Sequence, residues 1–128
     1  MGDTTYPRML EILTTAFDLF EGGKKWGRGT YRSHVTNCMC SGGAIACALN
    51  PDVYGPLDLN VDQRREYQDV MRTLAVHGFH VDANTMYGYE DVVYSNNDAA
   101  EDFGQVRQAW VSAIDTVRAG IATPAVQS

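Results

Sequence analysis

Two cysteines separated by one residue are the side chains of this sequence best suited to covalent chemistry. Cys38 and Cys40 stand at the start of a long run of small and apolar residues. A thiol at a helix N-terminus has a lowered pKa, and the resulting thiolate is a good nucleophile. His34 or His80 could serve as the base, and Asn97 or Asp98 could orient the imidazole. A thiol-dependent enzyme or a small-molecule-binding protein that uses Cys38 or Cys40 is therefore one hypothesis.

The same cysteines also fit a structural role, because no thiol-enzyme signature surrounds either of them. On a helix over residues 38–49, Cys40 and Cys47 share one face with Ala44 and would pack there as small apolar side chains. The catalytic residues are thus unassigned, and the candidates are Cys38, Cys40, His34, His80 and Asp98.

A zinc site is the second chemical alternative, with Cys38, Cys40, His77 and His80 as four ligands of the right type. The spacing argues against it. A Cys-x-Cys pair in a helical turn directs its two sulfur atoms to different sides, and no second cysteine pair completes a zinc motif. The sequence therefore predicts neither a metal nor a cofactor.

A second set of candidates combines aromatic, basic and amide side chains. The cluster Asn96-Asn97-Asp98 suits a turn or a helix cap, but with tyrosines nearby it could also form a polar pocket or a protein contact surface. The basic residues between positions 24 and 32 are either a solvated loop or a patch for an anion or an acidic partner. The candidate binding residues are Trp26, Arg28, Arg32, Tyr89, Tyr94, Asn96, Asn97 and Asp98.

The elements that must position these residues are mainly helical. Apolar residues at helical spacing predict helices over 7–21, 61–77 and 103–119, and an apolar run predicts a buried central helix over 38–49. Asn60 with Gln63, and Asp102 with Gln105, have capping-box spacing. Gly42 and Gly43 lower helix propensity, so we expect a neighbouring element to approach too closely there for a side chain.

Residues 79–95 lack a clean helical period, so we expect a loop with a short extended piece or a single turn near 91–94. It could pair with residues 30–33 in a small two-stranded element. The predicted fold class is α+β, mainly α, with about four helices around the central helix.

Length and composition fit one globular domain over residues 1–128, with a flexible C-terminal tail from about residue 121. The chain has 128 residues, 45% of them hydrophobic and 20% charged. A net charge of −6 disfavours a nucleic-acid binder, since phosphate contacts need a basic surface. No apolar stretch is long enough to cross a membrane, and no signal peptide is recognisable, so the sequence predicts a cytoplasmic protein with reduced cysteines.

Three short motifs occur here in a recognisable order. They are the loop Lys25-Trp26-Gly27-Arg28-Gly29, the motif Cys38-x-Cys40-x-x-Gly43-Ala44, and an Asn97-Asp98 turn that leads into a helix with Val106 and Ala113. In this order they resemble a small domain of unknown function of actinobacteria and their phages, over roughly residues 9–117. Members often carry a tryptophan immediately before the Asn-Asp pair, where this chain has Asn96.

The resemblance implies an origin and a shape rather than a reaction, because that family has no settled activity. It suggests an accessory protein of an actinobacteriophage, acting in the host cytoplasm. We therefore favour a non-enzymatic protein that binds a host or phage protein through the loop 24–34 and the segment 86–98. A homo-oligomer is also compatible with the sequence, whereas a membrane or nucleic-acid partner is not expected.

Overall fold

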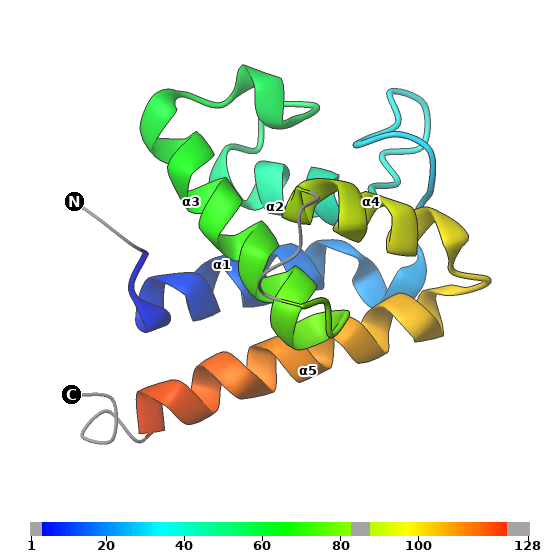
Figure 1. The fold of residues 1–128 in the computed structure, drawn as a ribbon. Coiled ribbons are helices and arrows are strands. Elements are labelled where there is room, and N and C mark those ends of the chain that lie inside the picture. The colour runs from blue at the N-terminus through cyan, green and yellow to red at the C-terminus, as the bar shows by residue number, and fades with distance from the viewer. Residues whose placement is uncertain (1–3, 83–87, 123–128) are drawn as a thin grey trace.

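The computed structural model describes residues 4–82 and 88–122, and these fold into a set of packed helices (Figure 1). No sheet occurs within the described residues. The described part of the chain is thus mainly helical, as expected, and the α+β class is not confirmed. Its elements are α1 (Tyr6–Leu19), the 3₁₀ turn η1 (Glu21–Gly23), α2 (Ser41–Leu49), the 3₁₀ turn η2 (Pro56–Asp58), α3 (Val61–Thr73), the π-turn η3 (Leu74–Gly78), α4 (Tyr89–Ala99) and α5 (Phe103–Ala122).

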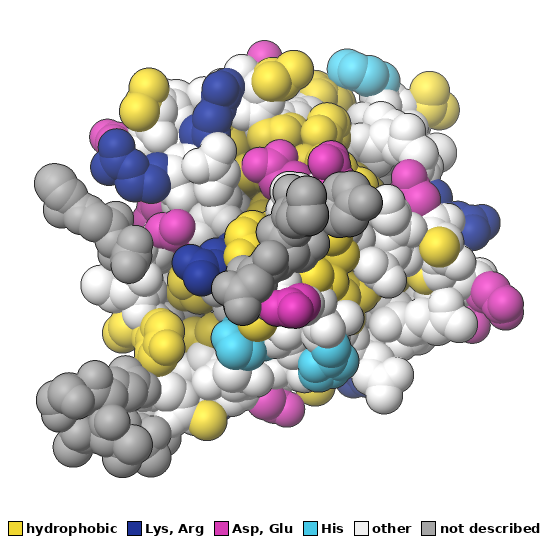
Figure 2. All heavy atoms as spheres, in the orientation of Figure 1, with side chains coloured by type: hydrophobic (Ala, Val, Ile, Leu, Met, Phe, Trp, Pro, Cys, Tyr) yellow, Lys and Arg dark blue, Asp and Glu magenta, His cyan; other side chains and the backbone are white. Residues whose placement is uncertain are grey.

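The short helix α2 is enclosed by other helices. Every residue from Ser41 to Cys47 is buried, and α2 packs against α1, α3 and α4. The long helix α5 runs beside α1 and closes the fold on another side (Figure 1). Figure 2 shows acidic and basic side chains interspersed over one face of the molecule, with hydrophobic side chains visible between them.

The close approach expected at Gly42 and Gly43 is confirmed. A Cβ atom at Gly43 would lie 1.7 Å from the carbonyl oxygen of Tyr31, and one at Gly42 would lie 2.6 Å from a ring carbon of Tyr94. Both distances are far shorter than a van der Waals contact. The start of α2 can therefore carry only glycine at these two positions.

The predicted start of this helix is wrong by three residues. The helix begins at Ser41 with Cys40 as its N-cap residue, whereas the sequence pattern placed Cys38 in its first turn. The cause is a set of cross-loop hydrogen bonds that hold the preceding residues extended. Met39 N–H donates to the Lys25 carbonyl at 2.7 Å, and Gly27 N–H donates to the Met39 carbonyl at 2.9 Å.

The segment over residues 91–94 is neither extended nor paired with residues 30–33. It lies inside α4, whose buried residues Val93 and Asn97 are one helical turn apart. Glu90 and Asp91 in the first turn favour a helix, since acidic side chains interact well with its N-terminus. The β-branched residues at 92 and 93 concealed this pattern. The only bridges found in the described part of the chain are isolated ones from Met39 to Trp26 and to Arg32.

The predicted capping box of α3 is complete, whereas at α5 only the bond to the Asp102 side chain is formed as predicted. In α3, Gln63 N–H donates to the Asn60 side chain at 2.8 Å, and Asn60 N–H donates to the Gln63 side chain at 3.1 Å. At α5, Gln105 N–H donates to Asp102 at 3.3 Å, while the Gln105 side chain accepts from the backbone of Glu101. Helix α5 extends to Ala122, and the rest of the predicted tail lies outside the described residues.

Candidate functional site

The loop over residues 24–40 is attached to the helices mainly through one amide side chain. Asn97 of α4 is fully buried. Its Oδ1 atom accepts from Trp26 Nε1 at 3.0 Å, and its Nδ2 group donates to the carbonyl of Gly27 at 3.1 Å. One side chain thus binds the loop twice. Trp26, an expected binding residue, is held by this contact and packs against the core.

The same amide also reaches α2 and, through α2, helix α5. Asn97 Oδ1 accepts from the backbone N–H and the hydroxyl of Ser41, at 3.1 and 3.0 Å. Trp110 Nε1 donates to that hydroxyl at 3.0 Å. We call these groups, Trp26, Gly27, Ser41, Asn97 and Trp110, the amide hub. Because buried polar groups need partners, each member fixes the position of the others.

Two further contacts hold the outer side of the loop on α4. The Asp98 carboxylate accepts from Gly29 N–H at 3.0 Å. Arg28 donates to the carbonyl of Ala100 at 2.9 Å, and its guanidinium lies 5.8 Å from the centre of the Trp26 ring. Arg28, Asp98 and the amide hub therefore hold residues 26–29 of the loop on the end of α4.

Three tyrosines, one each from the loop, α3 and α4, meet through their hydroxyl groups. The hydroxyls of Tyr67 and Tyr94 are 2.6 Å apart, and the Tyr31 hydroxyl donates to that of Tyr94 at 3.0 Å. Tyr94 also donates to Glu90 at 3.3 Å. Burial raises the pKa of both Tyr67 and Tyr94 well above the ordinary range. These hydroxyls are therefore neutral at physiological pH and act as hydrogen-bonding groups.

A hollow of about 340 Å³ opens between the loop and α4. It brings together three of the predicted site residues, Cys40, Tyr94 and Asp98. Residues of the loop form the other wall, namely Gly29, Thr30 and Tyr31. The hollow is large enough for a small ligand, since such pockets have volumes of about 300–1,000 Å³.

Cys40 is not arranged as an activated nucleophile. Cys40 is buried, and its sulfur accepts from Gly43 N–H at 3.5 Å. Burial raises the pKa of this thiol despite that bond. Cys38 is half-buried, and its thiol donates to the carbonyl of Lys24 at 3.6 Å. Cys40 therefore acts as a protonated cap for α2.

The candidate bases do not line the hollow. The His34 ring stacks on Tyr54, with the ring centres 4.1 Å apart. His80 is exposed and follows the π-turn with a φ of 59°. Asp98 reaches the hollow, but its carboxylate is bonded to the backbone of Gly29. The hollow thus holds a cysteine and a carboxylate of the hypothetical thiol site but neither candidate base.

The tip of the loop is exposed to solvent, unlike its hydrogen-bonded base. Val35 is 92% exposed, and the residues on either side of it are exposed as well. The turn beneath it is closed by Ser33 N–H to the Cys38 carbonyl at 2.9 Å and Asn37 N–H to the Ser33 carbonyl at 3.0 Å. Sequence reasoning missed Val35, although an apolar residue between His34 and Thr36 in a polar loop was a usable signal.

Tyr54 is a second residue that sequence reasoning missed. It is 38% exposed, has the Arg32 guanidinium 4.5 Å from its ring centre and stacks on the His34 ring. Arg32 is fixed by donating to the carbonyls of Pro51 and Val53, at 2.9 and 3.1 Å. We define Arg32, His34, Val35 and Tyr54 as the loop-tip surface.

The remaining predicted binding residues lie on α4. Asn96 is exposed and donates to the carbonyl of Val92 at 2.9 Å. Tyr89 is half-buried, with the Arg72 guanidinium 5.6 Å from its ring centre. Residues 86 and 87 of the expected contact segment lie outside the described residues.

Neither a metal cluster nor a membrane-spanning helix is found in the described part of the chain. No group of three or more His, Cys, Asp and Glu side chains there could hold a metal ion. Likewise, no helix in residues 4–82 or 88–122 combines the length and apolar character needed to cross a membrane.

Comparison with known proteins identifies a family. The model of a family of unknown function, DUF6197, matches residues 4–116. The chain belongs to this family. DUF6197 thus covers the amide hub, the hollow and the loop-tip surface. No curated protein and no solved structure matches the chain.

The match to DUF6197 confirms the expected relation to a domain of unknown function. The origin in actinobacteria and their phages, which the motifs suggested, stays a prediction. A family of unknown function assigns no activity, so the function must be argued from the site itself.

Proposed function

We propose that this protein is a non-enzymatic binding protein, and that its loop-tip surface contacts a partner protein. The observation that carries the proposal is the contrast between an anchored loop and its exposed tip. A loop held by buried hydrogen bonds loses little conformational entropy on binding, which increases affinity.

The side chains of the loop-tip surface are those that dominate protein interfaces. Tyrosine and arginine are enriched among residues whose truncation costs most binding energy. Arg32, Tyr54 and His34 form one stack, and Val35 projects next to His34 as an apolar anchor. Burying one valine side chain against a partner contributes roughly 1.5 kcal/mol or more.

The charge of the loop suggests the kind of partner. Arg28 and Arg32 lie in the loop, together with Lys24 and Lys25, although the whole chain is acidic. Such a basic segment on an acidic protein favours an acidic protein face and steers association with it. The motif order further supports an actinobacteriophage accessory protein in the host cytoplasm, with a host or phage protein as the partner.

Two valines offer a matched test of this proposal. Val35 and Val61 are both strongly exposed, at 92% and 75%, and Val61 lies outside the loop at the start of α3. We would immobilise the wild type, Val35→Asp and Val61→Asp and compare the proteins each retains from an actinobacterial lysate. The proposal expects a partner that binds wild type and Val61→Asp and is lost with Val35→Asp. Finding no protein with this pattern would contradict it.

The hollow favours a second candidate function, the binding of a small molecule next to Cys40. The raised pKa of Cys40 argues against a thiolate mechanism there. Native alkylation with iodoacetamide at neutral pH tests the thiol-dependent form of this function. Labelling of Cys40 in the folded protein would support it, whereas protection of Cys40 until the protein is denatured would rule out Cys40 as the nucleophile.

A further inference from the structure

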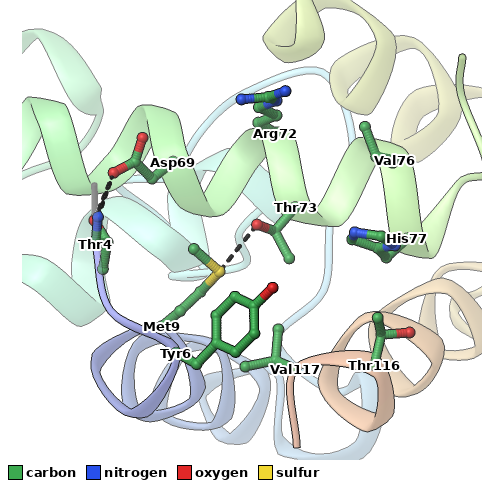
Figure 3. A pocket seen from close by; sticks show the side chains of 10 residues that line it. All are labelled: Thr4, Tyr6, Met9, Asp69, Arg72, Thr73, Val76, His77, Thr116 and Val117. Carbon is green, nitrogen blue, oxygen red and sulfur yellow. Dashed lines mark hydrogen bonds between the residues drawn. The ribbon is translucent and has the colours of Figure 1, made fainter. Parts of the chain in front are cut away.

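A groove lies at the opposite end of the fold from the loop 24–40, where α1 begins and α5 ends (Figure 1). It is bounded by the start of α1, the end of α3 with its π-turn η3, and the second half of α5 (Figure 3). We call it the terminal groove. Its volume is about 440 Å³, and its floor is apolar, with Met9 and Val117 both buried.

The π-turn shapes one wall of this groove. Phe79 N–H donates to the carbonyl of Leu74 at 3.0 Å, five residues back along the chain. Such turns are rare in helices and occur frequently at functional sites. The turn places His77 one turn beyond Arg72 and Thr73, so three polar side chains line the same wall (Figure 3). It is held against α5 by Ser112, whose hydroxyl donates to the His77 carbonyl at 2.8 Å.

Two of these polar groups have weak partners within the protein. The Thr73 hydroxyl donates to the sulfur of Met9 at 2.9 Å, and a thioether is a weak acceptor. Arg72 has no carboxylate of the described residues within ion-pair distance, and its guanidinium lies over the Tyr89 ring. A carboxylate oxygen would be a much stronger acceptor for both groups.

Asp69, the acidic residue that lines the groove, is already hydrogen-bonded to another lining residue, Thr4. Asp69 Oδ2 accepts from the backbone N–H and the hydroxyl of Thr4, at 2.9 and 2.7 Å. Figure 3 shows the Asp69 carboxylate directed at Thr4, and the Tyr6 ring standing over the floor near Thr73. The donors Arg72, Thr73 and His77 thus lie on one wall, next to an apolar floor and an aromatic ring.

We propose that the terminal groove binds a small organic carboxylate with an apolar body. The carboxylate accepts from Arg72 and Thr73, with His77 beside them, and the body packs on Met9, Val117 and the Tyr6 ring. This site is independent of the loop-tip surface, because it lies at the other end of the fold and uses different elements.

Benzoate is a suitable probe, and benzyl alcohol is its neutral counterpart. We would titrate the full chain with each and follow backbone amide shifts by NMR. The proposal expects saturable shifts with benzoate at residues of the three walls, and at least about tenfold weaker binding of benzyl alcohol. Equal binding of the two probes, or no saturable shift with benzoate, would overturn it.

A matched pair of arginines on α3 locates the site. Arg65 is exposed on α3 and borders a different hollow. Arg72→Gln is expected to weaken benzoate binding about tenfold, as for loss of a charge-assisted hydrogen bond, whereas Arg65→Gln leaves it unchanged. Thr73→Val gives a smaller loss of about threefold. Equal effects of Arg72→Gln and Arg65→Gln would place binding elsewhere and overturn the proposal.

Discussion

The base of the loop 24–40, at Trp26 and Gly27, is held by hydrogen bonds to a buried side chain, whereas its tip at Val35 is exposed to solvent. At the base, a buried amide meets indole, hydroxyl and backbone groups, and no buried side-chain polar atom of the described residues lacks a partner. At the tip, Val35 is almost fully exposed. The polar groups of the base are thus paired within the protein, whereas the tip leaves apolar surface in water. The difference separates the part of the loop that determines the fold from the part available for recognition.

The largest effect is expected where the loop backbone touches α2. Gly43→Ala would place a methyl group 1.7 Å from the Tyr31 carbonyl oxygen, so the loop or the helix must move. We expect a loss of about 4 kcal/mol or more in the free energy of unfolding, measured by urea denaturation. Gly104→Ala is the control, because the nearest atom there is the end of the Asp102 side chain, and it should change stability by less than about 1 kcal/mol. Similar losses for both variants would show that the contact at Gly43 is unimportant.

The amide hub gives the next largest effect, with an adjacent residue as its control. Asn97→Ala removes the acceptor of Trp26 and Ser41 and leaves their buried donors unpaired, which should cost about 3 kcal/mol. Asn96→Ala removes an exposed amide and should cost less than about 0.5 kcal/mol. Urea denaturation of the two variants measures the difference. Equal stabilities would mean that the loop does not depend on Asn97.

The tyrosine cluster predicts how stability depends on pH. The pKa of Tyr67 is raised by burial, so its hydroxyl contributes stability that is present below the unfolded pKa of about 10 and is lost as the pH rises above it. We expect the free energy of unfolding to fall between pH 9 and pH 11, and to fall less in Tyr67→Phe. Tyr54→Phe, which removes an exposed hydroxyl, should follow the wild-type curve. A Tyr67→Phe curve as steep as that of the wild type would exclude this tyrosine as the cause.

The smallest effect on stability is expected at the tip itself. Val35→Asp replaces an exposed side chain, so the free energy of unfolding, measured by thermal denaturation, should change by less than about 0.5 kcal/mol. If this variant also loses the partner described above, then recognition and stability are separable in one loop. A large destabilisation by Val35→Asp would instead place the tip within the folded core.

Helices could be predicted from this sequence more securely than the loop that forms the site. The capping box at Asn60, the cap bond at Asp102 and the close approach at Gly42 and Gly43 followed from local chemistry, and each is confirmed. The start of α2 was mispredicted because hydrogen bonds across the loop, from partners distant in sequence, hold Met39 extended.

The role of Asn97 could not be derived for the same reason. Local rules assign an asparagine in such a cluster to a turn or a cap, whereas its partners Trp26 and Ser41 are supplied by the tertiary fold. Val35 shows the converse difficulty. A lone valine in a polar loop is a signal of either an exposed contact or a side chain folded back onto the core, and its type alone does not decide between them.

We infer that Asn97 fixes the loop 24–40 in one conformation. Native-state hydrogen exchange of the amides of Gly27, Met39 and Cys40, which donate across the loop, measures this claim. We predict protection comparable to that of α2 in the wild type and in Asn96→Ala, and at least about tenfold faster exchange in Asn97→Ala. Unprotected amides in the wild type, or equal protection in both variants, would contradict it.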